Sequence, residues 1–72
     1  MTLLEQLRTM RHRVAVEKDL PSYYLLHNNI LVLIATDKPT TREELMSISG
    51  FGARKFEVWG DDILAIVSNY LK

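Results

Sequence analysis

Residues that interrupt helices are spaced through the 72-residue chain: Pro21, Pro39, Gly50, Gly52 and Gly60. Proline has no backbone N–H to donate and pushes the preceding residue out of the helical region, and glycine commonly ends a helix. The pieces between these breaks carry apolar residues at helical spacing. The apolar run at residues 30–34 could also be a buried strand, but no second strand exists with which it could pair. We therefore expect an all-α fold, a compact five-helix bundle.

The first piece carries both the start signal and the periodicity of an amphipathic helix. Thr2 and Glu5 have the spacing of a capping box, in which each side chain accepts a hydrogen bond from a free backbone N–H at the helix start. Apolar residues then recur at steps of four, three and four and stack on one face: Leu3, Leu7, Met10 and Val14. We expect this helix to run from about residue 2 to residue 18.

Two more helices are expected before the glycines. His27 or Asn28 can cap a second helix, which ends before Pro39. Its buried face is expected at four apolar positions: Ile30, Leu31, Ile34 and Ala35. Overlapping capping boxes then begin at Thr40 and at Thr41, so either threonine can cap a short third helix, which Gly50 ends.

The last third of the chain is expected to form two helices separated at a glycine. A fourth helix from about residue 53 to residue 59 stops at Gly60, and a fifth occupies the rest of the chain. Three aromatic residues are expected in the core: Phe56, Trp59 and Tyr70. No repeat or linker divides the chain, so residues 1–72 are expected to form a single domain, a monomer.

The composition limits the partners of this domain. Nine Lys and Arg residues balance nine Asp and Glu residues, so the net charge is zero and any binding to nucleic acid must come from a local patch and be weak. The longest apolar run is far shorter than the roughly 20 residues of a membrane-spanning helix, and charged residues interrupt the first 15 residues where a signal peptide would lie. We expect a cytoplasmic protein that does not bind membranes.

No group of residues has the pattern of a catalytic site. The chain has no cysteine, and its two histidines, His12 and His27, are not spaced as shared ligands of a metal. Its acidic pairs, at residues 43–44 and 61–62, lie in the first turns of helices, where they stabilise the helix dipole. We therefore expect no enzymatic activity, no metal and no cofactor.

The glycine turn Gly50-Phe51-Gly52 is the first candidate for a binding site. Amides at Gly52 and Ala53, at the start of the following helix, have no carbonyl partners within it and attract phosphate. Arg54 and Lys55 add positive charge, although cations there oppose the helix dipole. The alternative is a purely structural role, in which the glycines make a turn between helices and Phe51 fills the core.

The second candidate is the pair of tyrosines after Pro21. Pro21 fixes the local backbone, so the ring of Tyr23 or Tyr24 can be held at the surface, where it stacks on an unpaired base. Lys18 and Arg13, late in the first helix, would place charge beside the ring. In the alternative interpretation both rings seal the small core.

In this order, the motifs resemble those of the HRDC domain, the helicase and RNase D C-terminal module, most of all that of bacterial RecQ helicases. The resemblance rests on the amphipathic first helix and on motifs along the chain: Pro21-Ser22-Tyr23, residues 31–35 before Pro39, Glu44-Leu45, Ile48-Ser49-Gly50-Phe51-Gly52, Lys55 and Trp59-Gly60. The chain departs from the family pattern in its zero net charge and in Trp59, where a tyrosine or phenylalanine is more usual.

The resemblance implies a five-helix bundle with a helix-hairpin-helix-like glycine turn, cut from a larger bacterial, nucleoid-associated helicase. It implies an auxiliary domain that binds single-stranded DNA, or DNA with single-stranded regions, and that contacts the helicase core of its own chain. Tyr23 matches the tyrosine associated with DNA binding, and Lys55 lies in a region implicated in DNA contact. Two alternatives remain: a protein-docking module whose contact is Tyr24, Leu25 and Leu26, and an RNA-binding module of an RNase D-like nuclease.

Overall fold

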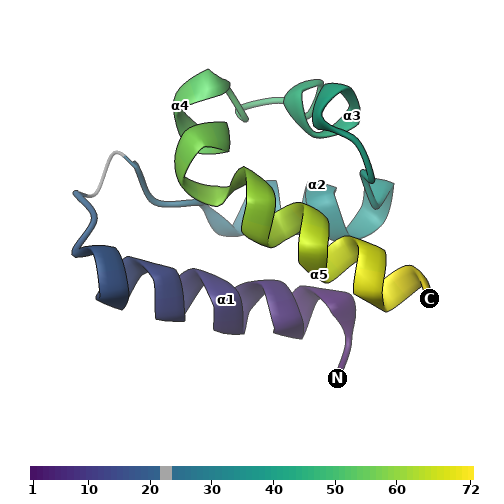
Figure 1. Cartoon of the computed structure of the whole chain (residues 1–72), viewed down its shortest axis with the longest axis horizontal. Coiled ribbons are helices and arrows are strands. Elements are labelled where there is room, and N and C mark those ends of the chain that lie inside the picture. The colour runs from purple at the N-terminus through teal and green to yellow at the C-terminus, as the bar shows by residue number, and fades with distance from the viewer. Residues whose placement is uncertain (22–23) are drawn as a thin grey trace.

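The computed structural model describes residues 1–21 and 24–72, and the regular structure of this part of the chain is entirely helical (Figure 1). Its elements follow one another in this order: α1 (Leu3–Lys18), α2 (Asn28–Asp37), α3 (Arg42–Met46), α4 (Ala53–Lys55), the π-helical segment η2 (Phe56–Gly60) and α5 (Asp61–Leu71). The expected all-α class is confirmed. None of the helices in the described ranges is long and apolar enough to cross a membrane.

The expected break at Gly60 is wrong, so the described residues form four separate helices and not five. α4, η2 and α5 follow one another without a gap, and Gly60 has helical dihedral angles (φ −58°, ψ −51°). The ring of Phe56 explains the glycine, because a Cβ atom at position 60 would lie 2.7 Å from two of the ring carbons. Gly60 therefore makes room for a side chain one turn earlier and does not end the helix.

The starts of α1 and α3 follow the expected caps, whereas His27, the N-cap of α2, makes no side-chain capping bond. At α1, Thr2 Oγ1 accepts a hydrogen bond from the Glu5 N–H (3.2 Å), and Glu5 Oε1 accepts one from the Thr2 N–H (3.1 Å). Of the two candidates at α3, Thr41 is the cap and accepts from the Glu44 N–H (3.2 Å). The Glu44 carboxylate in turn accepts from the Thr40 N–H (2.9 Å). Local sequence thus determines where these two helices begin.

The core lies where α1, α2 and the long α4–η2–α5 helix meet, and α1 packs against both α2 and α5. All four expected residues of α1 are buried, as are Ile30, Leu31 and Ile34 of α2, whereas Ala35 is only half-buried. Further buried side chains come from the other segments: Leu26, Leu45, Ile48, Phe51, Trp59, Ile63 and Val67. The result is one small apolar core.

Two of the three aromatic residues assigned to the core behave differently from Trp59, which is completely buried. Phe56 is half-buried, with the Arg42 guanidinium 5.0 Å from its ring centroid. Tyr70 is 44% exposed, so its assignment to the core is wrong. It shares the helical phase of Ile63 and Val67, but it lies in the last turn of α5, past the end of the core.

Candidate nucleic-acid interface

The stretch between α1 and α2 carries the tyrosines on which base stacking was predicted. Tyr23 lies outside the described residues, so its role stays a prediction. Tyr24 is half-buried, and its backbone N–H donates to the carbonyl of Pro21 (3.0 Å). The carbonyl of Tyr24 accepts a hydrogen bond from the indole N–H of Trp59 (2.7 Å). A buried side chain of η2 therefore anchors the backbone beside the predicted stacking residue.

The glycine turn joins α3 to α4 and has the structural role considered for it. Gly50 has a φ of 85°, a left-handed conformation that glycine adopts without steric cost, and Phe51 is only 3% exposed, so the turn does plug the core. Gly52 is the N-cap of α4, and both it and Ala53 are exposed. Their amides are among the first of a helix that continues to the end of α5, where backbone N–H groups have no carbonyl partner within the helix.

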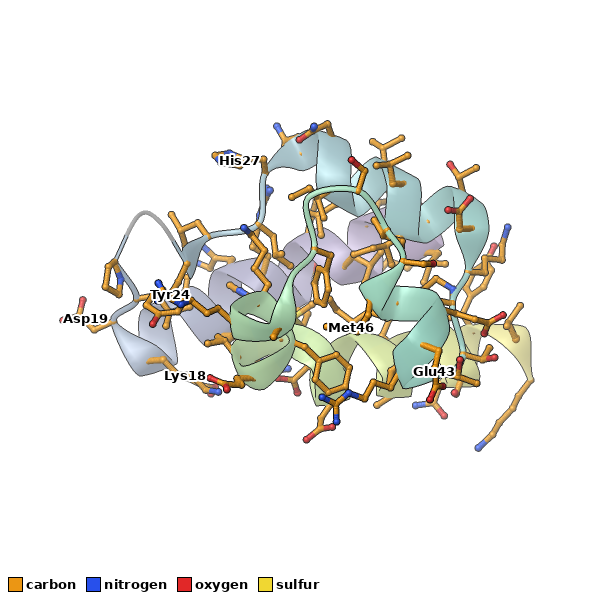
Figure 2. All side chains as sticks on the ribbon, turned by 90° about the horizontal axis from the view of Figure 1, so that it is seen from above. Lys18, Asp19, Tyr24, His27, Glu43 and Met46 are labelled. Atoms are coloured by element: carbon orange, nitrogen blue, oxygen red, sulfur yellow. The ribbon has the colours of Figure 1, made fainter. Side chains whose placement is uncertain are left out.

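The predicted basic residues divide into two groups. Arg54 is exposed and Lys55 half-buried in the first turn after Gly52. Lys18, at the end of α1, extends to the same helix, because its Nζ atom donates to the carbonyl of Val58 (3.5 Å). Figure 2 shows Lys18 and Tyr24 together at the end of the molecule away from α3. The structure thus brings Lys18 close to the helix that carries Arg54 and Lys55.

Arg13 points to a different side of α1. It lies five residues before Lys18, which is about 140° around the helix. Its Nη1 atom is 3.7 Å from Glu17 Oε1, and the side chain lines a shallow pocket together with Ile66 of α5. The structure therefore does not bring Arg13 to the glycine turn.

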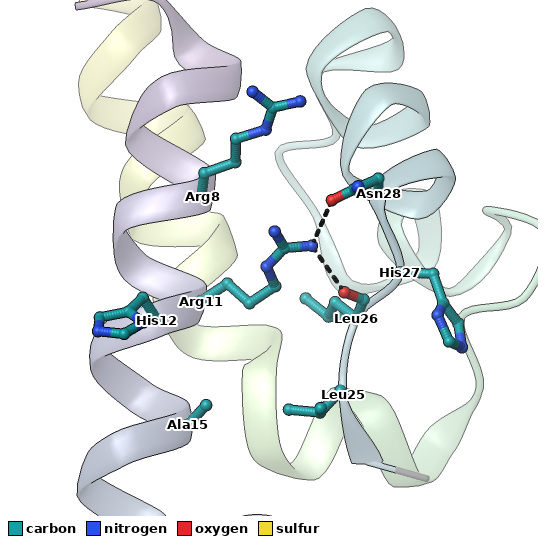
Figure 3. Close-up of a pocket in the computed structure, with 8 residues that line it drawn as sticks. All are labelled: Arg8, Arg11, His12, Ala15, Leu25, Leu26, His27 and Asn28. Carbon is teal, nitrogen blue, oxygen red and sulfur yellow. Dashed lines mark hydrogen bonds between the residues drawn. The ribbon is translucent and has the colours of Figure 1, made fainter. Parts of the chain in front are cut away.

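A groove that the sequence reasoning missed lies between α1 and the start of α2 (Figure 3). We call it the α1–α2 groove. It has a volume of about 460 Å³ and is lined by Arg8, Arg11, His12 and Ala15 of α1 and by residues 25–28. In Figure 3 the two guanidinium groups reach from α1 toward α2, and the histidine rings lie at the outer edges.

Arg11 joins the two walls of the α1–α2 groove. Its Nη1 atom donates to the carbonyl of Leu26 (2.9 Å) and to Oδ1 of Asn28 (2.8 Å). Leu26 itself is only 1% exposed and belongs to the core, so it is not available for the docking surface of Tyr24, Leu25 and Leu26 that we considered from the sequence. One signal for the groove was present: Arg8, Arg11 and Ala15 have helical spacing and form a second stripe on α1.

Two carboxylates near these surfaces are engaged in helix caps. Hydrogen bonds from the backbone and side chain of Thr2 lower the pKa of Glu5, which precedes Arg8 by one turn. Hydrogen bonds from Thr40, and secondarily from Thr41, lower the pKa of Glu44 at the start of α3. Each of these hydrogen bonds stabilises the ionised form of the carboxylate that accepts it, so both carboxylates stay ionised to a lower pH than a free glutamate.

Comparison with known proteins places the chain among helicase accessory domains. The HRDC domain family matches residues 1–67. The chain is 42% identical over 65 residues to the ATP-dependent DNA helicase UvrD2 of Mycobacterium tuberculosis, covering 90% of this chain and 9% of that helicase. It is 31% identical over 70 residues to the ATP-dependent DNA helicase RecQ of Pasteurella multocida, covering 97% of this chain and 11% of that helicase. No solved structure gives a significant match.

The fold and these matches define a small helical accessory module of DNA helicases. The chain belongs to the HRDC domain family, as the motifs along its sequence indicated. It spans about a tenth of the length of the curated relatives that it matches.

Proposed function

We propose that this chain is the auxiliary nucleic-acid-binding domain of a bacterial ATP-dependent DNA helicase, and that it binds single-stranded DNA weakly and helps the helicase select its substrate. The observation that carries the proposal is the contact of Lys18 Nζ with the carbonyl of Val58. Val58 follows Lys55 by three residues, about one helical turn, so Lys18 adds its charge to the helix that begins at the glycine turn. Residues 1–72 would then act as one domain of the longer protein.

In this proposal the glycine turn and Lys18 bind the phosphates of the strand. Lys18, Arg54 and Lys55 supply the positive charge, and the amides of Gly52 and Ala53 supply backbone donors for a phosphate oxygen. Tyr23 stacks on a base beside them, which is worth roughly 1 to 3 kcal/mol per base and is indifferent to sequence. About two or three phosphates are neutralised, so a plot of the logarithm of the binding constant against the logarithm of the salt concentration has a shallow negative slope. Each phosphate contributes about 0.7 to this slope.

Titration of a labelled single-stranded DNA oligonucleotide tests the proposal. Replacing both Lys18 and Lys55 with alanine should lower the salt slope by about 1.4, since two phosphate contacts are lost. The matched control is Lys72→Ala, which removes a charge at the far end of α5 and should leave the slope unchanged. A wild-type chain that binds no oligonucleotide at low salt would overturn the proposal.

An RNA oligonucleotide of the same base sequence tests the alternative of an RNA-processing parent. Phosphate contacts and stacking do not distinguish the two sugars, so we expect similar affinities for DNA and RNA. The helicase relatives make DNA the physiological ligand in our proposal, with the parent helicase acting on DNA in the bacterial cytoplasm. An RNA affinity that exceeds the DNA affinity by tenfold or more would instead favour the RNase D-like role.

A further inference from the structure

The α1–α2 groove has the charge of a site for an anion. Two arginines and two histidines line it, and among its described lining residues there is no carboxylate. In the described ranges the one ion pair joins Arg13 to Glu17, so neither Arg8 nor Arg11 is paired with an acid. Glu5, one turn before Arg8, is bound to its cap by the Thr2 N–H and hydroxyl. No ion pair among the described residues therefore neutralises the positive charge of the groove.

Arg11 is held in place and still has hydrogen-bond donors for a ligand. Both of its hydrogen bonds to described residues use Nη1. A guanidinium carries five N–H donors in a rigid fork, so Nη2 and Nε keep the geometry that binds phosphate through two parallel bonds. The contacts with Leu26 and Asn28 fix the guanidinium before any ligand arrives, which lowers the entropic cost of binding.

The size and the walls of the groove fit one nucleotide. Its volume of about 460 Å³ lies within the range of small-ligand sites, roughly 300 to 1,000 Å³. The half-buried side chains of Ala15 and Leu25 give it an apolar wall below the two guanidinium groups. α2 begins at its edge with no acidic residue in the first turn and with His27 as an N-cap that makes no side-chain capping bond, so the helix dipole adds to the positive charge.

We propose that the α1–α2 groove binds one nucleotide of a single strand, with its phosphate on Arg8 and Arg11 and its base against Ala15 and Leu25. This inference rests on the proposed function and gives the domain a second contact with the strand. Residues 25–28 of the groove lie at the α2 end of the stretch between α1 and α2, and Lys18, at its α1 end, contacts Val58 of η2. A strand bound at the glycine turn continues past this stretch into the groove.

Arg8→Gln is the variant that tests the groove, because Arg8 is exposed and the change removes the guanidinium charge while keeping a polar side chain. We expect affinity for a single-stranded oligonucleotide to fall about two- to fivefold and the salt slope to fall by about 0.7. Lys72→Gln removes the same charge at the end of the chain and serves as the matched control. Arg11→Lys keeps the charge but loses the fork, and it should weaken binding with little change in the salt slope.

Chemical-shift mapping with the oligonucleotide separates this inference from the proposed function. If both hold, peaks move at residues 8–15 and 25–28 as well as at residues 50–56. If peaks move at the glycine turn alone, and Arg8→Gln binds like Lys72→Gln, the groove proposal is overturned and the proposed function stands. If the wild-type chain shows no shift and no binding, both are overturned.

Two further probes test the chemistry assigned to the groove. An abasic oligonucleotide of the same length keeps the phosphates, so it should still shift Arg8 and Arg11 but should shift Ala15 and Leu25 less. Equal shifts at Ala15 and Leu25 would overturn the contact with the base.

A glutamate-rich peptide of equal charge should move the groove peaks more weakly than the oligonucleotide. Equal or stronger shifts with the peptide would show an acidic protein segment as the ligand and would overturn the nucleotide proposal.

Discussion

The glycine turn and the α1–α2 groove differ in how their polar groups are brought together. At the turn, most of the donors come from consecutive residues, Gly52 to Lys55, and Lys18 reaches the same helix from α1. In the groove, Arg11 meets partners that lie 15 and 17 positions further along the sequence. The turn is therefore a local motif, whereas the groove exists only once α1 has packed against α2. The turn can therefore be recognised in the sequence, whereas the groove can be recognised only in the folded structure.

Trp59 connects the two regions. It lies in η2, on the helix that begins at the glycine turn, and its indole N–H is bonded to the carbonyl of Tyr24 (2.7 Å). Leu25 and Leu26, which line the groove, follow directly. The buried indole thus ties the chain beside the groove to the helix of the turn, and we expect the two regions to depend on it equally.

Trp59→Ala should have the largest effect and should disrupt both regions together. Truncating a buried aromatic residue costs about 3 to 5 kcal/mol, against a total stability of roughly 4 to 11 kcal/mol for a chain of this length. Circular dichroism during chemical denaturation measures the loss. Trp59→Phe keeps most of the packing but removes the indole hydrogen bond to the Tyr24 carbonyl, and should cost about 1 to 3 kcal/mol. A fully stable Trp59→Ala variant would contradict the buried position.

Gly60→Ala should destabilise the helix that carries the turn while leaving the groove intact. A Cβ atom at position 60 would lie 2.7 Å from the Phe56 ring, and overpacking of this kind costs about 1 to 3 kcal/mol. Alanine recovers up to about 1 kcal/mol through its helix propensity, which makes the net cost smaller. Thermal denaturation gives the stability, and the shifts of Arg8 and Arg11 report on the groove. A gain in stability would mean that the ring moves aside freely.

The turn's two glycines offer a matched pair of substitutions with different expected outcomes. Gly50→Ala places a side chain at a φ of 85°, with its Cβ 3.4 Å from Ile30 Cδ1, and should cost about 1 to 2 kcal/mol. Gly52→Ala has a φ of −102° and meets no atom within 4 Å, so stability should change by less than about 0.5 kcal/mol. Denaturation of both variants checks this difference.

The same pair tests whether the amides at the turn bind phosphate. The new methyl group of Gly52→Ala projects into open space, where the phosphate would approach, so we expect weaker oligonucleotide binding at unchanged stability. Unchanged binding by Gly52→Ala would remove the amides from the proposed interface and leave the turn a structural role alone.

Local signals in the sequence were sufficient for the helix starts and for most of the core. The cap from Thr2 to Glu5 and the apolar stripe of α1 depend only on residues within one or two turns, and both are confirmed. Gly60 could not be interpreted in the same way. A glycine that ends a helix and a glycine that makes room for a ring look alike in sequence, and the position of the Phe56 ring decides between them.

The groove was missed because its walls are distant in the sequence. The spacing of Arg8 and Arg11 is that of an ordinary solvated helix face. It indicates a groove only once residues 25–28 are known to lie opposite. The partners of Arg11 include a backbone carbonyl, that of Leu26, which no side-chain pattern reveals. Non-local packing supplies this information, so it could not be obtained from the periodicity of either segment.

Lowering the pH should produce the smallest loss of stability among these predictions. It should act on both regions through the glutamates of their helix caps. The pKa of Glu5, in the helix of the groove, and that of Glu44, in the helix before the turn, are each lowered from 4.5 by hydrogen bonds from threonines. A carboxyl group whose pKa is lower in the folded state stabilises the fold above the unfolded value. This stabilisation is lost as the pH falls from about 4.5 through the folded pKa.

Glu5→Gln and Glu44→Gln separate the contributions of the two caps. Each variant should flatten the dependence of unfolding free energy on pH below 4.5, because one carboxyl group of lowered pKa is removed. Urea denaturation at several pH values measures the slopes, and Glu57→Gln, at an exposed site in η2, controls for the loss of one negative charge. If the groove and the turn are linked through the core, either variant lowers the stability of both regions, as hydrogen exchange at residues 8–15 and 53–60 would show. Loss of protection confined to the helix that lost its cap would instead mean that the two regions unfold independently, and Trp59 would not couple them.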